Sequence, residues 1–251
     1  MECENFNKND LIMGFYRGPN IVTDGLVLYL DAGNTKSYPG TGTTWLDKSG
    51  YRNNGTLVNT PGYNSQNGGS IVFDGVNDFV EKSNIPVNSP ISFTASNFTL
   101  EHWIKITAYE PGTYFGLTNM IMAKGPTSTF NYATQVTNST TLTFIHRNNA
   151  EGLIGLNFTV PTLTNLITQV VFVITTTQVS LYISGNLSST QNLTGNPITP
   201  YNNDPLLLGG HYSTSNTSFT GNMYCHRIYN KALTAQEVLQ NYNATKSRFN
   251  L

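Results

Sequence analysis

Short segments in which apolar and polar residues alternate run through most of this sequence, and they constrain the fold more than any other feature. Leu26, Leu28 and Leu30 alternate with the residues between them, as expected of a strand with two different faces. Turn clusters such as Asn53-Asn54-Gly55 and Ser184-Gly185-Asn186 separate the segments and provide the backbone angles of tight hairpins. The predicted strands are Leu26 to Leu30, Ser70 to Phe73, Phe79 to Lys82, Phe98 to Ile106, Met120 to Lys124, Thr141 to His146, Leu153 to Val160, Gln169 to Thr175, Val179 to Ser184, Leu206 to Gly209 and Met223 to Asn230. Such a series predicts two packed antiparallel sheets or a jelly roll.

One helix is predicted near the end of the chain. Thr234 and Glu237 have the Thr-x-x-Glu spacing of a capping box, and apolar residues follow at helical spacing to about Lys246. Residues 1–23 have neither a strand nor a helix period, so we interpret them as an arm. Residues 24–251 contain no linker rich in Pro, Gly or Ser and are expected to form a single domain.

The charge of the chain excludes some partners. Thirteen basic and 14 acidic side chains leave a net charge of -1, so there is no general attraction to nucleic acid, which we do not expect as a partner. Charged residues make up 11% of the chain, against about 25% in an average soluble domain. A polar but weakly charged surface suits packing against other subunits or against neutral sugar hydroxyls.

Several features bear on where the protein is made. The opening ten residues lack the basic start and apolar run of a secretory signal. The longest apolar stretch, Leu166 to Ile183, is interrupted by polar residues and is interpreted as two strands, so no membrane span is expected. Cys3 and Cys225 do not make a disulfide framework. We therefore expect free thiols and synthesis in a reducing cytoplasm.

Five segments in this order resemble the laminin-G-like branch of the concanavalin A-like lectin/glucanase superfamily. They are the loop Trp45 to Gly50 with Asn53 to Leu57, the hairpin Phe73 to Val80, the strand Phe98 to Lys105, the hairpin Val179 to Leu187, and the closing strand and helix from Phe219 to Thr234. The resemblance covers residues 25 to about 245. It implies an all-β fold, a two-sheet antiparallel jelly-roll sandwich with one short C-terminal helix.

This fold serves lectins, glycosidases and structural proteins, so function depends on the site residues. Glucanases of the superfamily place several carboxylates on one strand, whereas the matching strand here offers Glu101 alone. The four histidines lack the paired spacing of a zinc site. We therefore expect no enzymatic activity and no transition metal.

Calcium is the one cofactor that the sequence leaves open, and none is required. Asp74 and Asp78 flank a tight glycine turn and offer oxygen ligands. The alternative is that both carboxylates hold the turn through backbone hydrogen bonds. The resemblance would also imply acidic residues where this chain has Tyr224 and Cys225, which argues against a calcium site of the family type.

Trp103 is the first candidate for contact with a sugar. In the predicted strand it shares the polar face with Glu101, opposite Phe98 and Leu100, and a ring beside a hydrogen-bonding group suits a sugar. The alternative is a tryptophan packed beneath a crossing loop. Tyr114 and Tyr212 lie in glycine-containing turns and are further candidates for the rim of a ligand site.

The resemblance extends in style to virion structural proteins of tailed phages, which implies a protein made in the host cytoplasm and displayed on the virion surface. In this hypothesis the chain is a non-enzymatic capsid decoration or fibre protein. Its arm would contact other virion proteins or copies of itself through Leu11, Ile12, Phe15 and Tyr16. Two alternatives remain: the arm folds back on its own domain, or the chain is a carbohydrate-binding adhesion module for host or cell-surface glycans.

Overall fold

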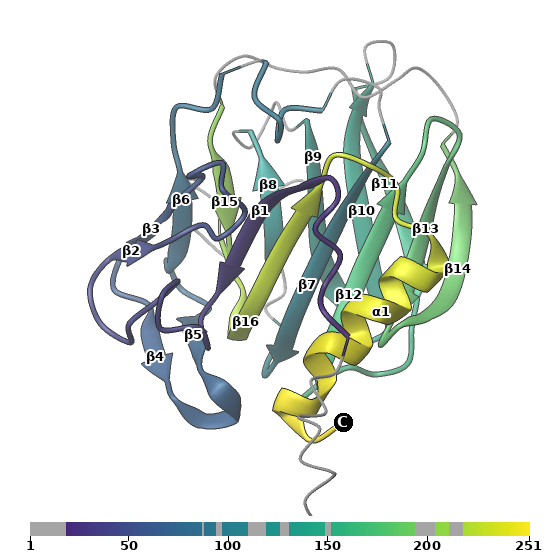
Figure 1. Cartoon of the computed structure of the whole chain (residues 1–251). Helices are drawn as coiled ribbons and strands as arrows, with labels where there is room; N and C mark the ends of the chain where they lie inside the picture. Colours follow the sequence, from purple (N-terminus) through teal and green to yellow (C-terminus); the bar gives the residue numbers. More distant parts are fainter. Residues whose placement is uncertain are drawn as a thin grey trace, which may run out of the picture.

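The computed structural model describes a two-layer sandwich of antiparallel sheets, which confirms the predicted jelly-roll fold with a short C-terminal helix (Figure 1). The described residues are 19–86, 88–93, 97–109, 119–125, 131–148, 152–193, 204–210 and 218–251. No helix among them is long and apolar enough to cross a membrane.

Sheet A contains the long central strands of the fold. Its order is β14-β13-β12-β7-β16-β5-β4, and β1 also pairs with β16. The strands are β1 (Leu26–Asp31), β4 (Gly62–Asn64), β5 (Ser70–Asp74), β7 (Phe98–Ile106), β12 (Ile167–Ile174), β13 (Gln178–Ile183), β14 (Asn186–Asn192) and β16 (Thr220–Tyr229).

Sheet B forms the other layer, in the order β11-β10-β9-β8-β15-β6-β3-β2. The strands are β2 (Thr44–Trp45), β3 (Gly55–Val58), β6 (Phe79–Lys82), β8 (Met120–Lys124), β9 (Tyr132–Asn138), β10 (Thr141–Asn148), β11 (Gly152–Thr159) and β15 (Leu206–Leu208). A short 3-10 turn, η1 (Gln66–Gly68), connects β4 with β5.

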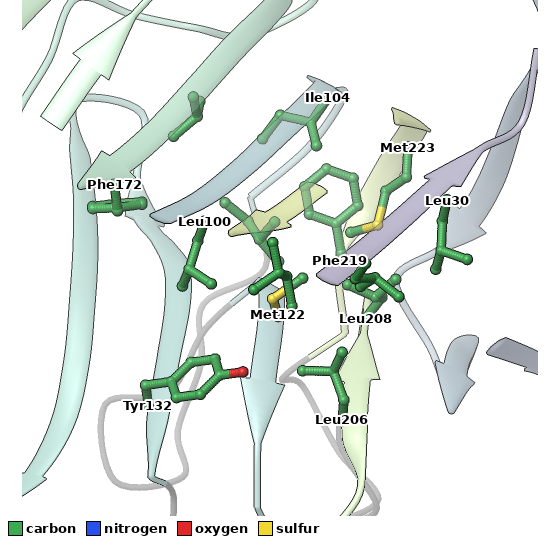
Figure 2. Close-up of a cluster of buried hydrophobic side chains, with 14 of the residues drawn as sticks. Leu30, Leu100, Ile104, Met122, Tyr132, Phe172, Leu206, Leu208, Phe219 and Met223 are labelled. Atoms are coloured by element: carbon green, nitrogen blue, oxygen red, sulfur yellow. The ribbon is translucent and has the colours of Figure 1, made fainter. Parts of the chain in front are cut away.

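The main core lies between the two sheets (Figure 2). Leu100 and Phe172 enter it from sheet A, and Met122 and Leu206 from sheet B. All four are almost completely buried, and burial of such side chains is the main favourable term in folding. The alternation seen in the sequence therefore corresponds to an inner and an outer face of each strand.

Helix α1 (Ala235–Thr245) covers part of the outer face of sheet A, and the 3-10 turn η2 (Lys246–Phe249) follows it (Figure 1). The predicted capping box is confirmed, because the Thr234 side chain accepts from the Glu237 amide and the Glu237 side chain accepts from the Thr234 amide. The apolar cluster beneath the helix includes Val22, Val171 and Val238. Sheet A is thus buried on both faces in this region.

All eleven predicted strands are present, with shifts of at most three residues at their ends. Five strands were missed: β2, β3, β4, β9 and β14. β2 and β4 are only two and three residues long, and β14 is an exposed edge strand of mostly Asn, Ser, Thr and Gln. Their sequences therefore have too little apolar alternation to be recognised.

Candidate functional site

Glu101, which was a candidate ligand-binding residue, lies on the outer face of sheet A but is fully buried. Its carboxylate accepts hydrogen bonds from Arg227 Nη1 at 2.7 Å, Gln169 Nε2 at 2.9 Å and Asn241 Nδ2 at 2.8 Å. The guanidinium of Arg227 also donates to Thr245 Oγ1. A buried charge needs this degree of pairing to be tolerated. The network therefore fixes the C-terminal helix to the sheet, and Glu101 is not accessible to a ligand.

Trp103 is also fully buried. Its ring stacks on Tyr242 of α1, with 5.7 Å between ring centroids, and lies 4.8 Å from the ring of Phe249. The prediction of a sugar-stacking platform is wrong for this residue, because stacking requires an open ring face. The alternative, a packed tryptophan, agrees with this burial, but the cover is α1 with η2 and not the expected crossing loop.

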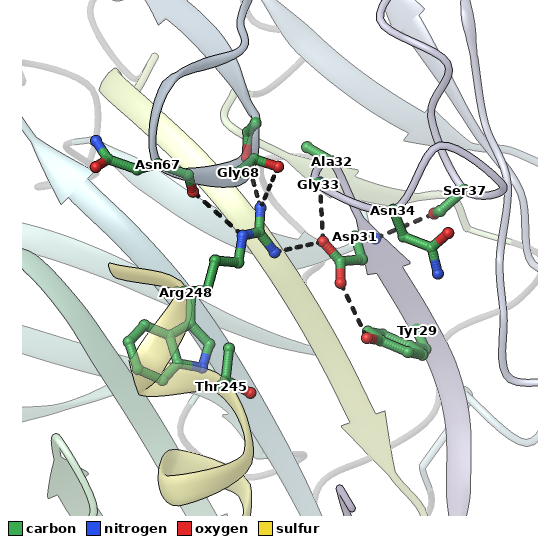
Figure 3. A network of polar contacts seen from close by, with 12 residues as sticks. Tyr29, Asp31, Ala32, Gly33, Asn34, Ser37, Asn67, Gly68, Thr245 and Arg248 are labelled. Atoms are coloured by element: carbon green, nitrogen blue, oxygen red, sulfur yellow. Dashed lines mark hydrogen bonds and ion pairs between the residues drawn. The ribbon is translucent and has the colours of Figure 1, made fainter. Parts of the chain in front are cut away.

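The C-terminal turn is held by a second polar network (Figure 3). Arg248 Nη1 donates to Asp31 Oδ1 at 2.6 Å, and the same guanidinium donates to the backbone oxygens of Asn67, Gly68 and Gly69. Asp31 is fixed in turn by the hydroxyl of Tyr29 at 2.9 Å. All these donors and acceptors already serve the fold, so this network offers little to a ligand.

Asp74 and Asp78 hold the turn between β5 and β6. Asp74 Oδ1 accepts from the Val76 amide at 2.8 Å, and Asp78 Oδ2 accepts from the Asp74 amide at 3.3 Å. Burial, together with the charge of Asp74, raises the pKa of Asp78 to about 6. These are the contacts of the turn interpretation. In the part of the chain that the structure describes, no three His, Cys, Asp or Glu side chains are grouped to hold a metal, and calcium at this turn stays a prediction.

The remaining predicted site residues lie outside the described residues. They are the rim candidates Tyr114 and Tyr212 and the arm anchors Leu11, Ile12, Phe15 and Tyr16. The end of the predicted arm is described from residue 19. There, the Val22 amide donates to Asn241 Oδ1 at 2.8 Å, and the Asn20 carbonyl accepts from Gln240 at 2.7 Å. The described part of the chain therefore begins at a fixed position beside α1.

Two histidines that are far apart in sequence meet in the core. His102 of β7 and His226 of β16 are opposite each other in the sheet, with 3.0 Å between their Nδ1 atoms. From the other sheet, Thr134 Oγ1 lies 3.3 Å from His102 Nε2. Sequence spacing could not show this pair. Among the described residues no third metal ligand joins it, so the pair is a hydrogen-bonded element of the core.

The outer face of sheet B carries a set of polar side chains that the sequence analysis missed. Gln135 Nε2 donates to Thr137 Oγ1 at 3.2 Å, the hydroxyls of Thr137 and Thr143 are 2.6 Å apart, and Thr143 Oγ1 donates to Asn157 Oδ1 at 2.7 Å. We call these four residues the polar ladder. It crosses β9, β10 and β11, because Gln135, Thr143 and Asn157 are paired across the strands.

The polar ladder has a direction. Thr143 gives its proton to Asn157, so Thr137 is the donor to Thr143, and Gln135 is the donor to Thr137. The chain ends at the exposed side chain of Asn157, whose Nδ2 has no hydrogen-bond partner among the described residues. Such chains polarise each donor in turn. Two amide hydrogens therefore remain available to an external acceptor.

Small and apolar residues lie beside the polar ladder on the same face. Met120, Ala123, Ala133 and Ile145 form one cluster, and Ile145 is paired with Ala133 and Gly155 across the strands. These four side chains are buried, as are Gln135 and Thr143 of the ladder. The accessible part of the face is therefore its β11 side, where Leu153, Gly155 and Asn157 are exposed.

These features define a lectin-like β-sandwich with a polar outer face. A family model described as the concanavalin A-like lectin/glucanase superfamily, laminin G type, matches residues 74–239. The match covers more than half of the chain, so the chain belongs to this family. No curated protein is significantly similar to it in sequence.

Solved structures with the same fold include binding domains of clostridial toxins. The binding domain of Paraclostridial mosquitocidal protein 1 has a TM-score of 0.68 and 16% identity, covering 88% of this chain and 52% of that one. The receptor binding domain of botulinum neurotoxin D has a TM-score of 0.66, 16% identity and the same coverage. The serotype D ligand binding domain in complex with N-acetylneuraminic acid has a TM-score of 0.66 and 15% identity, covering 88% of this chain and 51% of that one. The chain thus spans about half of these structures, and this level of identity shows the fold alone.

Proposed function

We propose that this protein is a non-enzymatic carbohydrate-binding module and that its binding surface is the exposed β11 side of the outer face of sheet B, at Asn157. The observation that carries the proposal is the polar ladder, which ends in an exposed amide with free donors. Sugar hydroxyls both donate and accept hydrogen bonds, so a neutral exposed amide suits them without the desolvation of a charge.

Two further observations support this proposal. A toxin domain with the same fold was solved with N-acetylneuraminic acid, which makes host or cell-surface glycans a reasonable ligand class. In addition, the carboxylate of Glu101 is fully engaged with Arg227, Gln169 and Asn241. Glycoside hydrolysis requires two accessible carboxylates, and this strand has no accessible one.

The proposal can be tested with Asn157→Leu, which removes the free amide, and with Asn192→Leu as the matched control. Asn192 is also exposed, but it lies in β14 of the other sheet. A glycan array identifies the ligand, and calorimetry measures its affinity for each variant. We expect Asn157→Leu to weaken binding at least about tenfold, as the loss of a hydrogen-bonding group in a site does, and Asn192→Leu to have no effect. No binding to any glycan at millimolar protein, or equal affinity for both variants, would reject the proposal.

We propose a structural role on a virion surface as the second candidate function, with synthesis in the host cytoplasm. It is favoured by the contacts of Asn20 and Val22 with α1, which give the preceding arm one defined point of attachment to the domain. Deletion of residues 1–18, which leaves those contacts intact, should abolish incorporation into particles. As a second test, alanine substitution of all four proposed anchors, Leu11, Ile12, Phe15 and Tyr16, should have the same effect without shortening the chain. Normal copy number in particles after both changes would exclude this role.

A further inference from the structure

The edge strands of the two sheets differ in how they are protected. Exposed edges readily pair with other chains, and natural proteins limit this with short strands, bulges, charges or proline. β2 has two residues and β4 has three. β1 has a register shift after Leu26 and ends at Asp31, and the pairing of β14 with β13 is shifted between Leu181 and Tyr182. Each of these edges has at least one such protection.

β11 has none of these protections. It is eight residues long, and its pairing with β10 runs from Asn148↔Gly152 to Thr141↔Thr159 without a register shift. Its sequence, Gly-Leu-Ile-Gly-Leu-Asn-Phe-Thr, contains neither a charge nor proline. Leu153, Gly155 and Asn157 are all exposed. β11 is therefore a long, regular and uncharged edge.

The free hydrogen-bonding groups of β11 follow from the antiparallel pattern. The Val160 amide donates to the Thr140 carbonyl, so even-numbered residues bond to β10 and odd-numbered residues turn their amide and carbonyl groups to the edge. The Asn157 carbonyl confirms this direction, because it accepts a hydrogen bond from Gln191 Nε2 of β14. It is therefore already engaged once, and a strand partner would use its second lone pair. Of the described strands, only β10 pairs with β11.

We propose that β11 pairs antiparallel with β11 of a second copy of this chain, about a two-fold axis at Gly155. In this register Leu153 faces Asn157 of the other copy, and Gly155 faces Gly155, where no side chain separates the backbones. A two-fold axis brings like groups together, so a charged edge would repel itself and this uncharged edge does not. The neighbouring strand β14 is also uncharged, so it adds no repulsion between the two copies.

The pairing would join the two B sheets into one continuous sheet. Because Asn157 of the polar ladder lies in β11, the two ladders would lie on the same face on either side of the axis. Two neighbouring sites raise the avidity for a surface that displays many copies of a ligand. The dimer itself does not depend on the proposed glycan binding, and its test uses protein alone.

The first test is disulfide trapping with Gly155→Cys in a Cys3→Ser background. A hydrogen-bonded antiparallel pair has Cα atoms about 5.5 Å apart, within the range of a disulfide. The new side chain has room, since a Cβ at Gly155 would be 3.4 Å from Thr143 Cγ2, and the native Cys225 is buried. Mild oxidation should convert most of the protein to a covalent dimer. Thr56→Cys, an exposed position of the same face in β3, is the matched control and should remain monomeric.

The second test is the mass in solution. Sedimentation or light scattering of the unmodified protein should give twice the chain mass at tens of micromolar. Gly155→Lys should raise the dissociation constant of the dimer at least about tenfold, because it places two like charges across the axis. Thr56→Lys should not shift it. Tryptophan fluorescence verifies the fold of each variant. A monomeric mass up to a few hundred micromolar, or trapping of the Thr56 variant as efficiently as the Gly155 variant, would overturn the proposal.

Discussion

The buried pair of His102 and His226 predicts that the fold loses stability in mild acid. Both rings are fully buried, and burial, with a smaller contribution from the charge of Arg227, lowers the pKa of His226 to about 3. Burial and the neighbouring His226 lower the pKa of His102 as well. In the unfolded chain a histidine titrates near 6.5. The unfolded state therefore binds protons at a pH where the folded state binds none.

The direction and size of the effect follow from this difference. The stability is fully present above about pH 6.5 and decreases as the pH falls toward the folded pKa, by about 1.4 kcal/mol per pH unit for each histidine. Between pH 7 and pH 5 each histidine costs about 2 kcal/mol, and the pair about 4 kcal/mol. Asp78 acts in the opposite direction, because its pKa is raised to about 6 in the folded state. Its protonation between pH 7 and pH 5 raises the free energy of unfolding by about 1 kcal/mol.

Urea unfolding at pH 7, 6 and 5 measures the effect, with fluorescence of the buried Trp45 and Trp103 as the probe. His226→Gln removes one titrating group. It should therefore reduce the loss of unfolding free energy between pH 7 and pH 5 by about 2 kcal/mol, however much the substitution itself destabilises the protein at pH 7. Thr134→Val is the control, because it removes a hydrogen bond to His102 without removing a titrating group. The reasoning is refuted if the stability of His226→Gln has the same pH dependence as that of the unmodified protein, or if NMR titration places either histidine near 6.5.

Three further changes test other parts of the structure. Asp78→Asn should stabilise the protein by about 1–3 kcal/mol at pH 7.5, since it removes a buried charge; urea unfolding at pH 7.5 and pH 4.5 checks that the gain disappears in acid. Glu101→Ala leaves Arg227 buried and unpaired and should cost about 3–5 kcal/mol, while Glu101→Gln, which keeps acceptors, should cost less; equal losses in thermal unfolding would contradict the importance of the charge. Trp103→Ala should cost about 3–5 kcal/mol through the cavity beside Tyr242, and a stable variant that loses glycan binding would show that the ring contacts ligand after all.

The sequence predicted the fold well because its evidence is local. Alternation of Leu28 with Leu30 reports the core face of a strand, and the spacing of Thr234 and Glu237 reports a helix start; both are confirmed. Leu26 departs from the predicted alternation, because a register shift between Leu26 and Leu28 places it in the cluster beneath the helix. The two faces of β7 were also assigned correctly. What lies over a face depends on distant segments, so the cover of Trp103 by α1 and η2 could not be deduced.

The polar ladder was missed for a related reason. β9 has the sequence Tyr-Ala-Thr-Gln-Val-Thr-Asn, in which small and polar residues hide the strand period. Thr143 and Asn157 are 14 positions apart, and only the register between β10 and β11 brings them together. A change of register by one residue would turn both side chains to the other face. A site that depends on register across three strands therefore has no local pattern in the sequence.

The distribution of charges connects the low charge content with the proposed binding surface. The ion pairs formed between described residues all lie on the side of sheet A, where Glu101 pairs with Arg227, Asp31 with Arg248, and Lys231 with both Asp24 and Glu237. These pairs hold α1 and the two ends of the described chain against that sheet. The part of sheet B that we propose as the binding surface, the β11 side with Asn157, carries neutral amides, hydroxyls and small residues. In this proposal the few charges of the chain close one side of the sandwich, while hydrogen bonds serve binding on the other.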